Sequence, residues 1–101
     1  MADLPVACTL GLDALRARRE GLLAELFRRA EGYELTTEGL RLRFAAGGDM
    51  LSTIARAVDA ERECCRFLRF GITVEPDAGP IMLELTGPPG TREFLAALLD
   101  A

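Results

Sequence analysis

Three cysteines, Cys8, Cys64 and Cys65, are the residues of this chain best suited to chemistry. Thiolates bind thiophilic ions such as Cu(I), Zn(II), Hg(II) and As(III). Glu61 precedes Cys65 by one helical turn, so its carboxylate is placed to add an oxygen ligand. The sequence has no Cys-x-x-Cys motif and no histidine, which excludes an imidazole ligand and a Cys-His catalytic pair within one chain. We therefore expect Cys8, Cys64, Cys65 and Glu61 to bind a soft metal or metalloid ion.

Two arginines, Arg62 and Arg66, lie one helical turn apart beside the paired cysteines. A nearby guanidinium favours the thiolate form of cysteine, whereas the negative C-terminal end of a helix disfavours it. Because the two effects oppose each other, the pattern does not indicate a strongly activated nucleophile. Catalysis would require a peroxide- or disulfide-type reaction in which the thiolate acts alone. The residues favour a binding protein over an enzyme.

A structural role for the cysteines is the alternative to a metal site. Free cysteine often behaves as a small buried hydrophobe, and Cys8 and Cys65 both fall on apolar faces. The protein would then be a non-catalytic interaction or dimerisation module. Phe67 is expected to project away from the core beside Ala57 and Ala60; a lone outward aromatic is common, and next to these small residues and the strand at Phe70 it is a candidate homodimer contact.

The segment 50–68 shows the period of a helix, with Asp49 as its expected N-cap. We centre its buried face on Val58. At 100° per residue, Leu51, Ile54 and Cys65 fall within about 40° of that centre, and Glu61 and Arg62 lie about 60° and 40° to either side. Charges at a core boundary cost free energy unless they are paired, so Glu61 and Arg62 should each have a partner.

Alternation and helical periodicity define the other elements. We expect strands at 4–10, 33–35, 40–45, 70–75 and 81–85, and helices at 12–31 and 91–99. Phe70, Ile72 and Val74 should face inward, whereas Arg41 and Arg43 should form a solvated strand face. The corner Gly87–Gly90 is either an anion site at a helix N-terminus or a rigid helix entry, and its two prolines favour the rigid entry.

The order of these elements predicts one α+β domain over residues 1–101. We expect a two-layer ferredoxin-like sandwich, with a mostly antiparallel sheet, helices on one face, and an added strand and C-terminal helix. The first strand would be central. Cys8 and Cys65 would then face the same layer, with their sulfurs within about 6 Å of each other, as two ligands of one ion require.

Composition limits the partners and the location of the protein. The net charge is −4, and all 12 basic residues are arginines without a basic cluster, so we expect no nucleic-acid partner. No basic region followed by an apolar stretch opens the chain, and no apolar run approaches a membrane span. These features favour a cytoplasmic protein with reduced cysteines and no membrane partner.

Two segments of the sequence resemble segments of a group of small uncharacterised bacterial proteins. The first is Glu61-Arg-Glu-Cys-Cys-Arg-Phe-Leu68, similar to their Glu-Arg-x-Cys-Cys-x-Phe-Leu core, and the second contains Leu85-Thr-Gly-Pro88, similar to their Leu-Thr-Gly-Pro ending. The resemblance covers roughly the last 40 residues, and Ala7-Cys8-Thr9-Leu10 also looks like theirs. Arg66 stands where members of that group often have proline. The resemblance implies a family and no activity.

Overall fold

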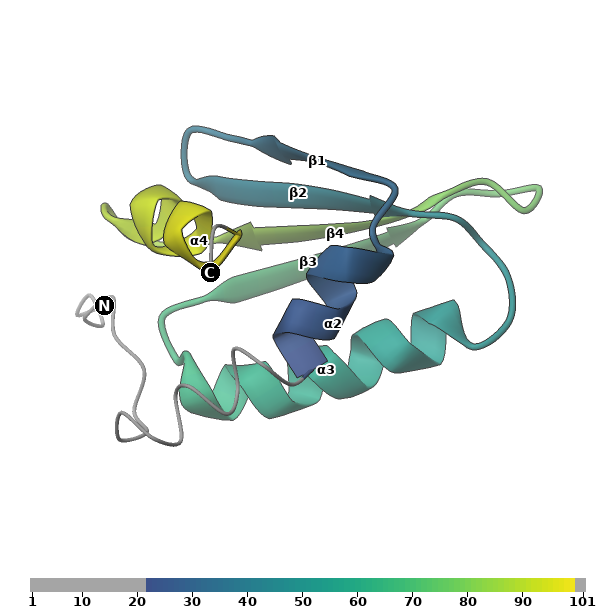
Figure 1. Cartoon of the computed structure of the whole chain (residues 1–101), viewed down its shortest axis with the longest axis horizontal. Coiled ribbons are helices and arrows are strands. Elements are labelled where there is room, and N and C mark those ends of the chain that lie inside the picture. Colours follow the sequence, from purple (N-terminus) through teal and green to yellow (C-terminus); the bar gives the residue numbers. More distant parts are fainter. Residues whose placement is uncertain (1–21, 100–101) are drawn as a thin grey trace.

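The computed structural model describes residues 22–99. Four antiparallel strands form one sheet in the order β1-β2-β4-β3 (Figure 1), where β1 is Gly32–Leu35, β2 is Gly39–Phe44, β3 is Arg69–Val74 and β4 is Ile81–Thr86. The helices of this part of the chain are α2 (Leu22–Arg29), α3 (Met50–Cys64) and α4 (Thr91–Leu99). The α+β class and the antiparallel sheet are as expected from the sequence. The expected strand at 4–10 lies outside the described residues.

One face of the sheet is apolar because the two interior strands alternate strictly. Leu40, Leu42 and Phe44 of β2 lie opposite Leu85, Leu83 and Ile81 of β4, and all six are buried. The helices add further buried residues to the same cluster, among them Leu26, Ile54, Leu95 and Leu98. Burial of this side-chain cluster holds helices and sheet together as two layers.

β2 and β4 are the interior strands among those that the structure describes. β2 pairs with β1 and β4, and β4 pairs with β2 and β3, so both interior positions are filled by described strands. The segment 4–10, for which we expect the central position, lies outside the described residues. The two-layer arrangement therefore stands, whereas the ferredoxin-like strand order is not established by the described strands.

Two tight hairpins set the register of β1 with β2 and of β3 with β4. In the first, Thr36 and Gly39 exchange backbone hydrogen bonds of 2.9 and 3.4 Å. In the second, the N–H of Gly79 donates to the carbonyl of Pro76 at 3.1 Å, and Asp77 and Ala78 between them have φ values of 60° and 59°. Left-handed conformations at both central positions are those of a type I′ turn, which matches the twist of antiparallel strands.

The buried face of α3 is rotated from the predicted one. Met50, Ile54, Ala57 and Glu61 are buried, whereas Leu51 is 44% exposed. This stripe is centred roughly 70° from Val58 on the helical wheel. The prediction for Leu51 and Ala57 was therefore wrong, because it weighted side-chain size; the small Ala57 instead faces the core, where a small side chain lets a helix approach its neighbours closely.

Phe67 also corrects a prediction. The helix ends at Cys64, four residues before its expected end at Leu68, so helical periodicity no longer applies at Phe67. Phe67 is 6% exposed and packs edge-to-face on Phe94 of α4, with ring centroids 5.2 Å apart. It therefore belongs to the core and is not the outward dimer contact that we expected.

Asp49 occupies the N-cap position of α3 without making a side-chain cap hydrogen bond. Its carboxylate instead lies 3.7 Å from the guanidinium of Arg29, at the end of α2. This exposed ion pair links two helices that also share the apolar cluster.

None of the helices in residues 22–99 has the length and apolarity that crossing a bilayer requires.

Candidate functional site

Glu61 and Cys65 come together at the C-terminal end of α3. They are one helical turn apart, and the N–H of Cys65 donates to the carbonyl of Glu61 at 2.6 Å as the helix closes. Both residues are 2% exposed. The thiol Sγ of Cys65 donates to Oε2 of Glu61 across 3.8 Å, a distance suited to the large sulfur atom.

The backbone after Cys65 holds this end of the helix in place. The N–H of Leu68 donates to the carbonyl of Cys65 at 3.1 Å, so residues 65–68 form a turn that leads into β3. Phe67, within that turn, is anchored by its contact with Phe94. The backbone of Cys65 is thus held by a helical hydrogen bond on one side and by a turn on the other, and its thiol is directed toward Glu61.

The Glu61 carboxylate is buried and therefore needs interactions that replace its hydration. A carboxylate transferred from water to a protein interior loses hydration, and hydrogen bonds or a cation must replace it. The nearby thiol supplies one such interaction. A buried oxygen donor beside a buried sulfur donor is also the kind of pair from which a binding site for a metal ion is built.

The remaining predicted ligands have different outcomes. Cys8 lies outside the described residues, and with it the expected approach of its sulfur to that of Cys65. Cys64 is the last residue of α3, and the position of its side chain is not described. Among described side chains, no group of three or more potential ligands lies close enough to hold a metal ion.

Arg62 does not lie at the core boundary where we placed it. Its side chain is 63% exposed, and its Nε donates to Oδ1 of Asp59 at 2.9 Å. Arg66 is exposed as well. The expectation that Glu61 and Arg62 each have a partner agrees with these contacts, although the partner of Arg62 is one turn back on the same helix. Its guanidinium is directed to a carboxylate and not to the thiol of Cys65.

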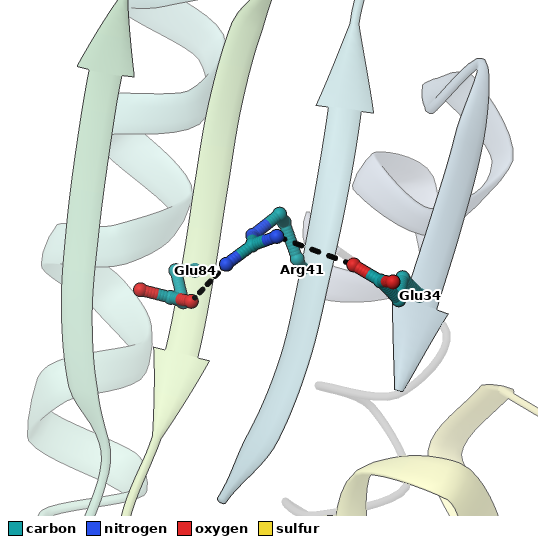
Figure 2. A network of polar contacts seen from close by, with 3 residues as sticks. All are labelled: Glu34, Arg41 and Glu84. Atoms are coloured by element: carbon teal, nitrogen blue, oxygen red, sulfur yellow. Dashed lines mark hydrogen bonds and ion pairs between the residues drawn. The ribbon is translucent and has the colours of Figure 1, made fainter. Parts of the chain in front are cut away.

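The outer face of the sheet is polar and carries a network of charges. Arg41, in β2, reaches Oε1 of Glu34 in β1 at 3.2 Å and Oε2 of Glu84 in β4 at 3.0 Å, so one guanidinium spans three strands (Figure 2). Arg43 pairs with Glu31 at 3.6 Å. These groups are exposed or half-exposed, so each pair stabilises the sheet by only about 0.2–1 kcal/mol. The predicted solvated strand face is confirmed.

The proline-rich corner before α4 is a stiff helix entry. The Thr91 hydroxyl donates to the carbonyl of Pro88 at 2.6 Å, and the N–H of Thr91 donates to the same oxygen at 3.1 Å. Glu38 and Glu93 line the shallow hollow beside it together with Arg92. Two carboxylates against one guanidinium make this hollow unfavourable for an anion.

Comparison with known proteins gives no relative. No family model, curated protein or solved structure matches the chain. The candidate site therefore stands on the contacts of Glu61 and Cys65.

Proposed function

We propose that the protein binds a soft metal or metalloid ion through the thiolates of Cys65, Cys64 and Cys8, with Glu61 as an oxygen ligand. The observation that supports this proposal is the buried pair at the end of α3, in which Sγ of Cys65 and Oε2 of Glu61 lie 3.8 Å apart. An acidic protein with net charge −4 also attracts cations in general.

The ligand chemistry decides which ions the site would prefer. Thiolates without imidazole form a soft, anionic site, which favours Cu(I), Zn(II), Hg(II) or As(III) over Mg(II) and Ca(II). Thiols must lose protons to bind, so affinity should fall as the pH falls. We place the protein in the cytoplasm, where reduced cysteines persist.

A metal titration of the reduced protein tests the proposal. Hg(II), As(III), Cu(I) and Zn(II) are each added while thiolate-to-metal absorbance is followed, for the wild type and for Cys8→Ser, Cys64→Ser and Cys65→Ser. We expect Cys65→Ser to weaken binding most, because the Cys65 thiol is buried and contacts the carboxylate of Glu61. Glu61→Gln keeps the shape of the side chain and tests the oxygen ligand.

Two outcomes of the metal titration would contradict the proposal. Binding no tighter than that of a free thiol, or equal binding by all three serine variants, would show that there is no site. Thermal unfolding of each apo variant serves as the control, because a variant that unfolds loses binding for an unrelated reason.

An interaction module is the second candidate function, and an exposed apolar strand favours it. Ile72 is 39% and Val74 55% exposed, although both lie on the apolar face of the sheet. The cysteines would then be core residues. The oligomeric state and the variants described next test this function independently of metal binding.

A further inference from the structure

Strand β3 leaves three apolar side chains at an open edge. Phe70, Ile72 and Val74 lie opposite buried residues of β4 and share their face, yet Phe70 is only half-buried and the other two are exposed. β3 is bonded to β4 on one side, and no other strand within residues 22–99 pairs along its outer edge. This corrects the expectation that all three side chains are inward, because an edge strand has a neighbour on one side only.

Within the described part of the chain, the backbone of β3 also has unpaired hydrogen-bonding groups along this outer edge, at the three residues that carry the apolar side chains. The N–H of Glu75 donates to the carbonyl of Pro80 at 3.2 Å, and Val74 lies opposite Ile81, so Glu75 and Pro80 are a hydrogen-bonded pair. Antiparallel strands alternate hydrogen-bonded and non-hydrogen-bonded pairs. Residues 69, 71 and 73 therefore bond to β4, whereas residues 70, 72 and 74 direct N–H and C=O groups outward.

We propose that this edge binds the same edge of a second copy of the chain, antiparallel and across a two-fold axis at Ile72. In that register Phe70 lies opposite Val74 of the second copy, Gly71 opposite Thr73, and Ile72 opposite Ile72. The outward backbone groups of residues 70, 72 and 74 then face each other as hydrogen-bonded pairs. The two sheets join into one, and the exposed apolar side chains meet on one face.

Charge complementarity selects this register. It places Arg69 opposite Glu75 of the second copy, and the symmetry makes this pair twice. Both are exposed, and neither has an ion-pair partner elsewhere in the described chain. They fall in a non-hydrogen-bonded pair, where side chains on facing strands come closest. Registers shifted by two residues would separate these charges.

The other open edge of the sheet is less suited to such pairing. β1 has four residues, and its Glu34 is already bound to Arg41 at 3.2 Å. Glu31, just before it, lies 3.6 Å from Arg43. Its charges are thus neutralised within the chain, whereas those of β3 remain available. The proposed dimer does not depend on metal binding.

Charge reversal tests the proposed pairing in the full chain. The oligomeric state is measured by sedimentation velocity over a dilution series of the reduced, metal-free protein. The wild type should be a dimer at micromolar concentrations. Arg69→Glu and Glu75→Arg should each weaken the dimer about tenfold or more, because each creates two like-charge cross-strand pairs. The double variant R69E/E75R should restore dimerisation.

Mixing the two single variants gives the sharpest result. Each alone has like charges at its interface, but one copy of each forms two complementary pairs, so an equimolar mixture should dimerise as the wild type does. Arg92→Glu, on the exposed side of α4, makes the same change of net charge as Arg69→Glu but away from β3, and it should leave the dimer unchanged. Thermal unfolding confirms that each variant is folded.

Three outcomes would overturn the proposal. The first is a wild-type protein that stays monomeric at about 100 μM, well above the dissociation constants of specific interfaces. The second is a dimer insensitive to both charge reversals, which would place the interface elsewhere. The third is a monomer in which the outward amides of β3 resist hydrogen exchange, which would show that another segment of the same chain occupies the edge.

Discussion

Gly39 begins β2 at a position where the backbone of β4 leaves no room for a side chain. A Cβ atom at this position would lie 1.8 Å from the carbonyl oxygen of Leu85, which is backbone and cannot turn aside. Gly39→Ala must therefore push β2 and β4 apart, and we expect it to lower the free energy of unfolding by about 2–4 kcal/mol, in the range of strained core substitutions. Urea unfolding measures the change.

Gly32→Ala is the matched control for that substitution. Gly32 also lies in a strand, but a Cβ there meets no atom within 4 Å. Its effect on the free energy of unfolding should stay within about 0.5 kcal/mol. Equal effects of the two substitutions would contradict the close approach at Gly39.

The candidate site could be predicted only where one element supplies it. The spacing of Glu61 and Cys65 placed them on one side of a helix, and they are in contact. The partner of Arg62 was not predicted, because an arginine on a helix can pair three residues back, and Asp59 offers a carboxylate there. A helical wheel predicts the direction of the Cα–Cβ bond. The arginine side chain is long, so its guanidinium can lie well away from that direction.

At the scale of elements, the contact between Phe67 and Phe94 joins the turn after α3 to α4. The rings meet edge-to-face at 84°. We expect Phe67→Ala to cost about 3 kcal/mol of stability, because the ring is almost fully buried. In a double-mutant cycle with Phe94→Ala, the coupling between the two rings should be about 1 kcal/mol.

Tyr33→Ala is the control for the aromatic pair, since Tyr33 is 61% exposed and should change stability little. Chemical unfolding of the four proteins of the cycle gives the coupling. Strictly additive losses would mean that the two rings act independently and that the turn is held by other contacts.

Elements with a clear period and clear ends were predicted well from the sequence. The helix 91–99 has the predicted bounds, since the prolines before it fix where it begins. The hairpin 33–45 and the strand 81–85 were predicted to within one or two residues. The C-terminal end of α3 was not predicted correctly. Arg66-Phe67-Leu68 contains no glycine, proline or other residue typical of a turn, so the helical pattern continued past the true end.

Strand order belongs to the scale of the whole molecule, and here the sequence was insufficient. Alternation tells which face of a strand is buried, but it does not tell which strands are neighbours. β2 and β4 both alternate strictly, and these two are interior. Phe70, Ile72 and Val74 alternate just as well in β3, yet β3 is at an edge of the sheet formed by the described strands, so the exposure of these side chains could not be predicted from the strand's own residues.

Hydrogen exchange across the sheet should reflect that order. Amides of β2 and β4 should exchange most slowly, because their strands have neighbours on both sides. In a dilute sample, the outward amides of Phe70, Ile72 and Val74 should exchange fast, and they should slow as the concentration rises and the dimer forms. Hydrogen exchange carried out below and well above the micromolar range, and read by mass spectrometry, measures both rates.

The outward amides of Tyr33 and Leu35 provide the internal control. Thr36 and Gly39 are a hydrogen-bonded pair, so by alternation these two amides of β1 also point away from β2. They should exchange fast at both concentrations. Slowing of both edges together would indicate general aggregation and not pairing through β3.

The turn formed by Pro76, Asp77, Ala78 and Gly79 determines the register of β3 against β4. Its length fixes which residue of β3 faces which residue of β4, and so which amides point to the edge. A single residue inserted into it would move every side chain of one strand to the opposite face. Arg69 and Glu75 would then trade places with apolar neighbours. The length of this loop is therefore more constrained than its composition, and length variants should be tolerated far less than substitutions.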